Sequence, residues 1–257
     1  MTAPLHLLGD EPVTDVLFFL KSAPVGRDLP WSRPVRMVAL DPGEFRGTGQ
    51  DPLTSTAYRR LFDSLPKDQV VPALLKRAGV RNPGRVAFVG FSAAHGFLDP
   101  LLRSAADRAR VDAVYLMDAC FGGGKAGYQA ALRDAAEGRM LLVAATGPSM
   151  TTPYVGGTLC LEREVLEPTG LSAAPTDSPD PAPSGGAFRV GRDGVWLRYE
   201  DVPHVEFGRL TRPLLSAYLL PRWRGRATSA PAEGGFPWVP AAVAALGAAA
   251  LWWFLRR

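Results

Sequence analysis

Six apolar runs of strand length alternate with helical segments along most of this chain. The runs are 15–20 (DVLFFL), 35–40 (VRMVAL), 85–91 (RVAFVGF), 113–117 (AVYLM), 140–145 (MLLVAA) and 194–199 (GVWLRY). Apolar residues with helical spacing lie between or after them, at 68–78, 98–110, 128–137 and 206–220. Continuous apolar runs are typical of strands buried on both faces of a parallel sheet. We therefore expect an α/β fold, a three-layer sandwich with a mostly parallel central sheet.

Composition excludes several classes of protein. With 257 residues, 47% hydrophobic and 21% charged, the chain is not collagen-like or disordered as a whole. Two cysteines and three histidines predict no disulfide framework and no metal site. We expect no cofactor, because neither a P-loop nor a dinucleotide fingerprint is present. The net charge is +4, but the cations are scattered without interleaved aromatics, so we expect no nucleic-acid partner.

The end of the chain has the length and composition of a membrane span. No charged residue occurs in 236–255, and a helix of about 20 residues at about 1.5 Å each would cross a bilayer of about 30 Å. Trp238, Trp252 and Trp253 lie near the two ends, where indole rings favour the membrane interface. We expect a single-pass C-terminal anchor over 236–257.

Small residues within this span, Ala244, Ala245, Gly247 and Ala248, would allow two such helices to pack closely, which predicts a homodimer through the anchor. The expected organisation is a domain over 1–226, a linker over 227–235 (ATSAPAEGG) and the anchor. Within the domain, 171–186 (LSAAPTDSPDPAPSGG) has the composition of a disordered insert. Because no N-terminal signal precedes the domain, we expect it on the cytoplasmic side of the membrane.

A serine follows the third apolar run on a turn of small residues. The turn reads GFSAAHG (90–96), and a helix is expected directly after it. A serine on a tight strand-to-helix turn has its hydroxyl exposed above the sheet. The backbone N–H of Ala93 and the start of the helix would then stabilise a developing oxyanion. Ser92 is therefore a candidate nucleophile.

A histidine and an aspartate occur in matching places further along the chain. His204 lies between the last apolar run and the last helix, and Asp118 ends the run that follows Ser92. A loop histidine in this position can fold back over the serine as general base. Asp118 would orient the imidazole and stabilise the imidazolium, while Glu162 and Asp201 are weaker candidates for the same role.

These segments resemble an α/β-hydrolase of the esterase and lipase type. The resemblance covers 15–220 and rests on 73–96 (ALLKRAGVRNPGRVAFVGFSAAHG) and 195–219 (VWLRYEDVPHVEFGRLTRPLLSAYL). The first is similar to the family's helix, strand and nucleophile elbow, and the second to its last strand, histidine loop and last helix. It implies a membrane-anchored serine hydrolase acting on an ester or related acyl bond, with Ser92 as nucleophile and His204 as base. The expected partner is a small-molecule or lipid-like acyl substrate.

The sequence departs from that family at three places. Ala94 replaces the second elbow glycine, and 21–23 (KSA) stands where the family has His-Gly after the first core strand. We assign the second oxyanion donor, beside Ala93, to Ser22 in that loop. The loop 146–153 has no carboxylate, although the family usually keeps its acid there. The resemblance therefore implies Asp118, at a position that some lipases of this fold use.

Two alternatives remain open from the sequence. His95-Gly96 followed by 113–124 (AVYLMDACFGGG) resembles the caspase and metacaspase family, which implies a cysteine protease with His95 as base and Cys120 as nucleophile. The other alternative is a non-catalytic, membrane-tethered binding module of the same fold. Convergence of Ser92 with His204, or of His95 with Cys120, separates these hypotheses.

Overall fold

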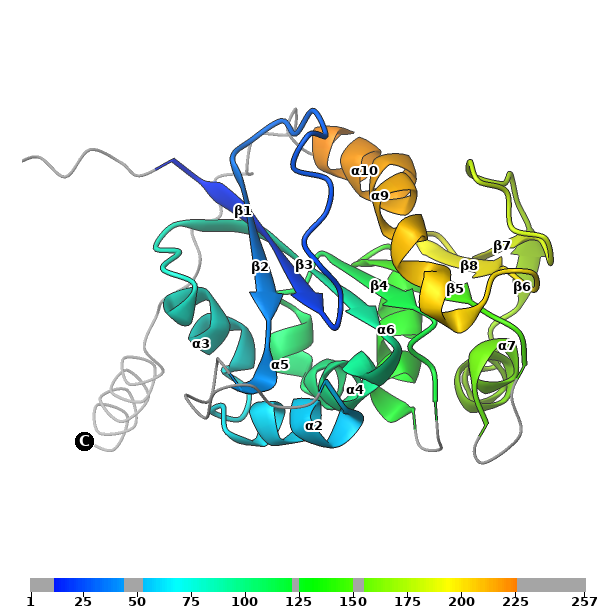
Figure 1. The fold of residues 1–257 in the computed structure, drawn as a ribbon, viewed down its shortest axis with the longest axis horizontal. Helices are drawn as coiled ribbons and strands as arrows, with labels where there is room; N and C mark the ends of the chain where they lie inside the picture. Colours follow the sequence, from blue (N-terminus) through cyan, green and yellow to red (C-terminus); the bar gives the residue numbers. More distant parts are fainter. Residues whose placement is uncertain (1–11, 44–52, 122–124, 150–154, 226–257) are drawn as a thin grey trace, which may run out of the picture. The chain divides into compact units, whose positions relative to one another are not determined.

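The central sheet is mostly parallel, and a computed structural model describes it through residues 12–43, 53–121, 125–149 and 155–225. In this part of the chain the sheet has eight strands, in the order β2-β1-β3-β4-β5-β8-β7-β6 (Figure 1). The strands are β1 (Thr14–Leu20), β2 (Val35–Leu40), β3 (Pro83–Phe91), β4 (Ala113–Met117), β5 (Leu141–Thr146), β6 (Ala173–Pro175), β7 (Ala187–Val190) and β8 (Gly194–Arg198). The first five and β8 pair in parallel, whereas β7 and β6 pair antiparallel. The expected α/β class with a mostly parallel sheet is confirmed.

The apolar runs are continuous because the sheet has a core on each face. Along β1, Val16 and Phe18 point into one core, while Leu17 and Phe19 point into the other. All four are essentially inaccessible to solvent. A strand alternates its side chains between the two faces, so a strand covered on both sides needs an apolar residue at every position.

Helical segments cover both faces of the sheet (Figure 1). On the side of the first core are α2 (Ser55–Asp63), α3 (Val70–Arg77), α4 (His95–Arg103), the short α5 (Ala105–Arg108), α6 (Ala126–Ala136), α7 (Gly157–Cys160), the π-helix η2 (Leu161–Leu166) and α8 (Glu167–Thr169). On the other side are the 3₁₀-helix η3 (His204–Leu210), α9 (Thr211–Leu214), the π-helix η4 (Leu215–Leu219) and α10 (Leu220–Gly225). A short 3₁₀-helix, η1 (Ser92–Ala94), joins β3 to α4.

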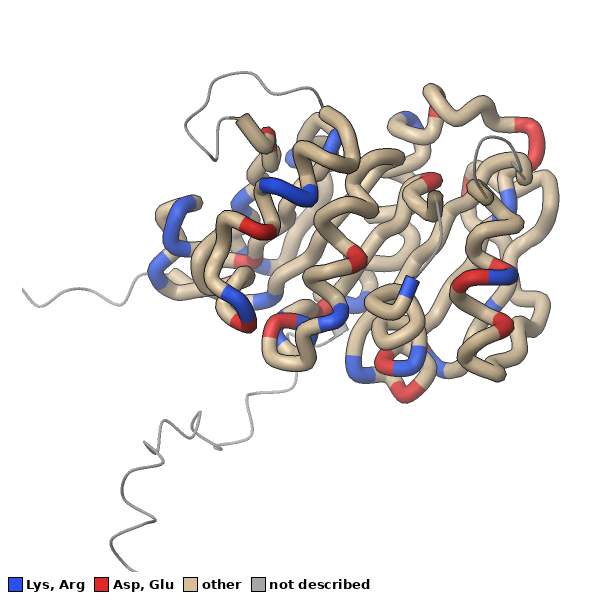
Figure 2. Tube along the Cα trace, turned by 90° about the horizontal axis from the view of Figure 1, so that it is seen from below, with Lys and Arg blue, Asp and Glu red and all other residues tan. Residues whose placement is uncertain are grey.

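Basic and acidic residues are interspersed along the trace (Figure 2), and many arginines pair with carboxylates. Arg85 forms an ion pair with the buried Asp15, and its guanidinium carbon lies 4.9 Å from the ring centre of Trp223. Trp223 donates its indole N–H to Asp112 at 2.6 Å, and Arg222 pairs with Asp193. These contacts fasten α10 to the ends of the strands.

The segment 171–186 differs from the disordered insert that its composition predicts. It contains β6, in which Ala173 pairs with Val190 of β7 and Ala174 with Arg189. An edge strand needs only backbone pairing on one side, and so it can form without an apolar pattern. The neighbouring β7 pairs with β6 on one side and β8 on the other, and with only four residues it is too short to be evident from the sequence.

The expected linker over 227–235 and the expected anchor over 236–257 lie outside the described residues. The chain divides into the units 1–224 and 225–257, and only Gly225 of the second unit is described. None of the helices in the described part has the length and apolar character needed to cross a membrane. The anchor over 236–257 and the homodimer through it stay predictions.

Candidate active site

Ser92 lies on the turn from β3 to α4 with a left-handed backbone, at φ 52°. The neighbouring chain is too close for larger residues there. A Cβ atom added to Gly90 would lie 2.3 Å from Leu98 Cδ1 and 2.9 Å from Ala94 Cβ. The small residues of the turn thus allow α4 to pass close to β3, which positions the Ser92 hydroxyl beyond the end of the strand.

His204 starts η3 in the segment after β8, and its ring is fixed between two phenylalanines. It stacks on Phe91, with ring centres 4.8 Å apart, and meets the ring of Phe121 edge-on at 5.3 Å. Its Nε2 atom lies 2.8 Å from Ser92 Oγ. The structure therefore brings together two residues that are 112 positions apart in the chain.

Asp118 follows the end of β4, with φ 44°, and its side chain is 3% exposed. Its Oδ2 atom lies 2.7 Å from His204 Nδ1, and its Oδ1 atom accepts the backbone N–H of Gly147 at 3.1 Å. A carboxylate only accepts hydrogen bonds, so Nδ1 carries the proton and Nε2 accepts the Ser92 O–H. The result is a continuous chain of hydrogen bonds from Asp118 through His204 to Ser92.

The two other candidate acids lie elsewhere. Asp201 is exposed and accepts a hydrogen bond from the Ser184 hydroxyl at 2.5 Å. Glu162 lies on η2, on the opposite face of the sheet from η3. Of the three carboxylates named from the sequence, Asp118 is the one that meets His204.

The side chain of Lys21 also lies at this site, although the sequence indicated Lys21 only as part of the 21–23 loop. Its ammonium donates a hydrogen bond to Ser92 Oγ at 3.1 Å and lies 5.7 Å from the centre of the Phe91 ring. Burial lowers the pKa of Lys21 below its usual value. Its place in the sequence could have indicated that Lys21 lies at the site, because it directly follows the strand that pairs with the strand of Ser92.

Backbone conformations of positive φ gather at this site. Of the four non-glycine residues with positive φ in the described chain, three are Lys21, Ser92 and Asp118. Each directly follows a strand, β1, β3 and β4 respectively, and these strands are neighbours in the sheet. Such conformations cost free energy and persist where the surrounding fold enforces them, which is common at functional sites.

The expected oxyanion donors have different surroundings. Ala93 follows Ser92 directly in η1 and is buried. In the 21–23 loop, the backbone N–H of Lys21 is already donated to the Tyr58 hydroxyl. The Ser22 hydroxyl makes a long contact of 3.5 Å with the Ala23 carbonyl.

The cysteine hypothesis needs a free thiol at Cys120, and the structure does not have one. Cys120 is bonded to Cys160 in a disulfide, so it has no thiol to act with. The sequence predicted no disulfide framework, and this bond corrects that expectation. His95 Nδ1 lies 3.1 Å from the Ser92 carbonyl oxygen. The local pattern around Cys120 could not reveal its partner, because Cys160 comes from α7, 40 residues away.

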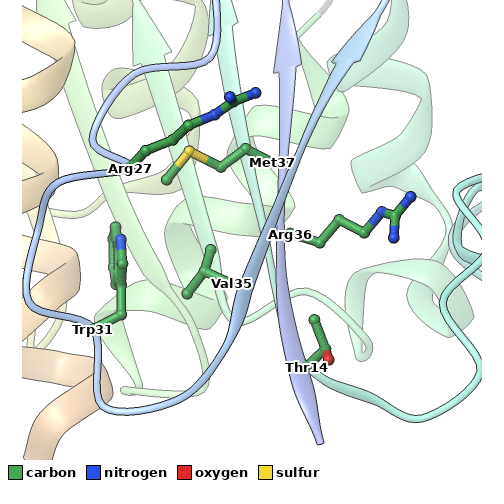
Figure 3. A pocket seen from close by; sticks show the side chains of 6 residues that line it. All are labelled: Thr14, Arg27, Trp31, Val35, Arg36 and Met37. Atoms are coloured by element: carbon green, nitrogen blue, oxygen red, sulfur yellow. The ribbon is translucent and has the colours of Figure 1, made fainter. Parts of the chain in front are cut away.

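Described residues line two hollows. One of about 250 Å³ lies beside Lys21, at the carboxyl ends of β1 and β2, and is lined by Phe19, Lys21, Ser22, Ala23, Ala39, Leu40, Asp41, Leu53 and Tyr58. The other, of about 530 Å³, is lined by Thr14, Arg27, Trp31, Val35, Arg36 and Met37 (Figure 3). Although larger, the second contains no residue of the Ser92 cluster. Among the described residues, no three His, Cys, Asp or Glu side chains gather into a metal site.

No protein-family model matches this chain, and a search of curated proteins finds no match either.

Proposed function

We propose that this protein is a serine hydrolase that cleaves an ester or related acyl bond with Ser92, His204 and Asp118. The observation that carries the proposal is the hydrogen-bond chain through the three side chains, 2.7 Å from Asp118 to His204 and 2.8 Å from His204 to Ser92. A hydroxyl within hydrogen-bond reach of a base, which is itself oriented by a third group, is the geometry of an activated nucleophile.

The reaction follows from the protons in this chain. Ser92 Oγ attacks the acyl carbonyl while His204 Nε2 takes its proton, and Asp118 stabilises the imidazolium. The tetrahedral intermediate collapses when His204 gives that proton to the leaving group. Water then attacks the acyl-serine in the same way and frees Ser92. The Ala93 N–H, at the start of the helical turn, is proposed as an oxyanion donor.

The arrangement of strands supports membership of the α/β-hydrolase family. The serine follows β3, the acid follows the adjacent β4, and the histidine follows β8. In open parallel sheets, ligands bind beyond the carboxyl ends of the strands, where these residues lie. The hollow of about 250 Å³ that Lys21 lines is the proposed place for a short acyl or alcohol group.

We make a separate proposal about the side of the membrane on which this domain lies. The sequence predicts a cytoplasmic domain, but a disulfide such as Cys120–Cys160 forms and persists in oxidising compartments. The disulfide therefore favours the non-cytoplasmic side. Labelling of the full chain in sealed membrane vesicles with an impermeant lysine reagent tests the side. If the exposed Lys67 and Lys76 react only in vesicles whose cytoplasmic face is outward, this proposal fails.

The decisive test of the catalytic proposal is labelling with a fluorophosphonate, which reacts with activated serines. The wild-type protein should be labelled, and the Ser92→Ala variant should not. Ser172, which is exposed, offers a matched control, and Ser172→Ala should be labelled like wild type. Labelling of Ser92→Ala at the wild-type rate would overturn the serine mechanism.

A further inference from the structure

Lys21 is placed at Ser92 by the pairing of two strands. Leu20, the last residue of β1, is in register with Gly90 of β3, so the residue after β1 lies beside the turn that holds Ser92. The left-handed backbone of Lys21, with φ 54°, turns the chain there. Its side chain reaches over Phe91 and donates to Ser92 Oγ at 3.1 Å.

The backbone N–H of Lys21 is engaged elsewhere. It donates to the Tyr58 hydroxyl, which in turn donates to the Leu40 carbonyl at 3.3 Å. An N–H already bonded to another oxygen is not available to a substrate. The end of β1 therefore presents the ammonium of Lys21 to the reaction centre, while its own amide is tied to α2.

No carboxylate of the described residues forms an ion pair with this ammonium, although burial makes a charge there costly. Its hydrogen-bond acceptor is the hydroxyl of Ser92. A half-buried cation whose partner is a nucleophile is well suited to stabilise negative charge that appears only during the reaction.

We propose that Lys21 is a catalytic residue whose ammonium holds the oxyanion of the tetrahedral intermediate, in the role expected of a second backbone N–H. This inference rests on the proposed serine-hydrolase function. As the bond from Ser92 Oγ to the acyl carbon forms, the electron pair of the C=O double bond moves to the carbonyl oxygen, and the serine proton moves to His204. The oxyanion and Oγ are then bonded to the same carbon, so a donor within reach of Oγ needs only a small movement to reach the oxyanion.

The test compares Lys21→Met and Lys21→Gln with wild type and with the exposed control Lys67→Met. With a short-chain aryl ester, the two Lys21 variants should lose about 10²–10³-fold in kcat with little change in KM, because the contact is made in the transition state. Their reaction with fluorophosphonate passes through a five-coordinate phosphorus centre with negative charge on the phosphoryl oxygen before fluoride leaves, and it should slow by a similar factor. Lys67→Met should match wild type, and thermal unfolding of all variants confirms that each is folded.

Several outcomes would overturn the inference. Wild-type kcat in a folded Lys21→Met or Lys21→Gln variant would show that the ammonium does not act on the intermediate. A rise in KM at constant kcat would assign Lys21 to substrate binding instead. Lys21→Arg, which keeps the charge, guards against poor folding of the neutral variants: it should retain more activity than Lys21→Gln, and equal loss in both would contradict the role of the charge. Loss of labelling in Ser92→Ala with undiminished labelling in Lys21→Met would reject this inference alone, whereas labelling of Ser92→Ala would reject the proposed function itself.

Discussion

The backbone N–H of Gly147 donates a hydrogen bond of 3.1 Å to Asp118 Oδ1, the carboxylate whose other oxygen meets His204. Gly147 begins the loop after β5, which has no carboxylate of its own. This loop therefore contributes to the candidate site by orienting the acid of the neighbouring strand. A Cβ at Gly147 would lie 3.0 Å from Asp118 Oδ2 and 3.2 Å from a ring carbon of Phe207, so the contact is tight.

Asp118→Asn should lower kcat for ester hydrolysis by up to about 10⁴-fold, because an amide no longer fixes the imidazole tautomer or stabilises its charged form. Steady-state kinetics measures the effect. Asp201→Asn is the matched control, and we expect it to keep wild-type kcat, since Asp201 is bonded to Ser184. The reverse result would move the acid from Asp118 to Asp201.

Gly90→Ala should destabilise the domain by about 1–3 kcal/mol, because its added methyl group meets Leu98 and Ala94 at less than normal contact distance. Chemical denaturation gives the free energy of unfolding. Gly208→Ala is a suitable comparison, because a Cβ there has no neighbour within 4 Å. Equal stability of the two variants would contradict the close packing of α4 on β3.

Removal of the disulfide by the double change Cys120→Ala and Cys160→Ala should cost about 4 kcal/mol of unfolding free energy, by the loop-closure entropy of 40 residues. The folded double variant should still hydrolyse the ester, because the proposed mechanism uses no thiol. Adding a reducing agent should destabilise wild type and leave the double variant unchanged. An inactive but folded double variant would contradict this prediction.

The pH dependence of kcat should contain an alkaline limb from Lys21. Oxyanion stabilisation needs the protonated ammonium, and burial lowers the pKa of Lys21, so activity is lost as pH rises through that lowered value. The titratable groups that face Lys21 are Asp41 and Tyr58 in the adjoining hollow, and His95 and His204 beside Ser92. Burial raises the pKa of Tyr58, and it lowers the pKa of His95 with a further contribution from Lys125.

A pH–kcat profile of Lys21→Arg checks this assignment. The alkaline limb should move to higher pH in that variant, because a guanidinium stays protonated. In Lys21→Gln, kcat should be lower than in wild type and should not fall at alkaline pH. A limb that is unchanged in both variants belongs to another group.

Truncation after Gly225 should leave a folded domain, since the compact unit comprises residues 1–224. Thermal unfolding and membrane partitioning measure the outcome, and the truncated chain should no longer partition into vesicles. A larger deletion, which ends the chain after Leu219, also removes Trp223, a residue that is 1% exposed and contacts Trp31 and Arg85. The chain that ends after Leu219 should be markedly less stable. If the chain that ends after Gly225 is unfolded, the predicted organisation is wrong.

The class of fold could be predicted from the sequence, and so could the strands that the side chains of the site follow. Apolar runs such as 15–20 and 113–117 are strands in the structure because burial on both faces is a local requirement, visible at every position of the strand. Ser92 and His204 were candidates for the same reason, since each follows a strand whose end is evident from the residues.

Which of these side chains meet is evident only from the tertiary structure. The choice of Asp118 over Glu162 and Asp201, the contact of Lys21 with Ser92 and the pairing of Cys120 with Cys160 all depend on strand order and on how α7 and η3 fold back. The edge strand β6 and its neighbour β7 are short and held by backbone pairing, which no apolar run of strand length indicates. Periodicity records which faces of an element are buried, whereas a hydrogen bond between residues 71 or 112 positions apart records where two elements lie in space.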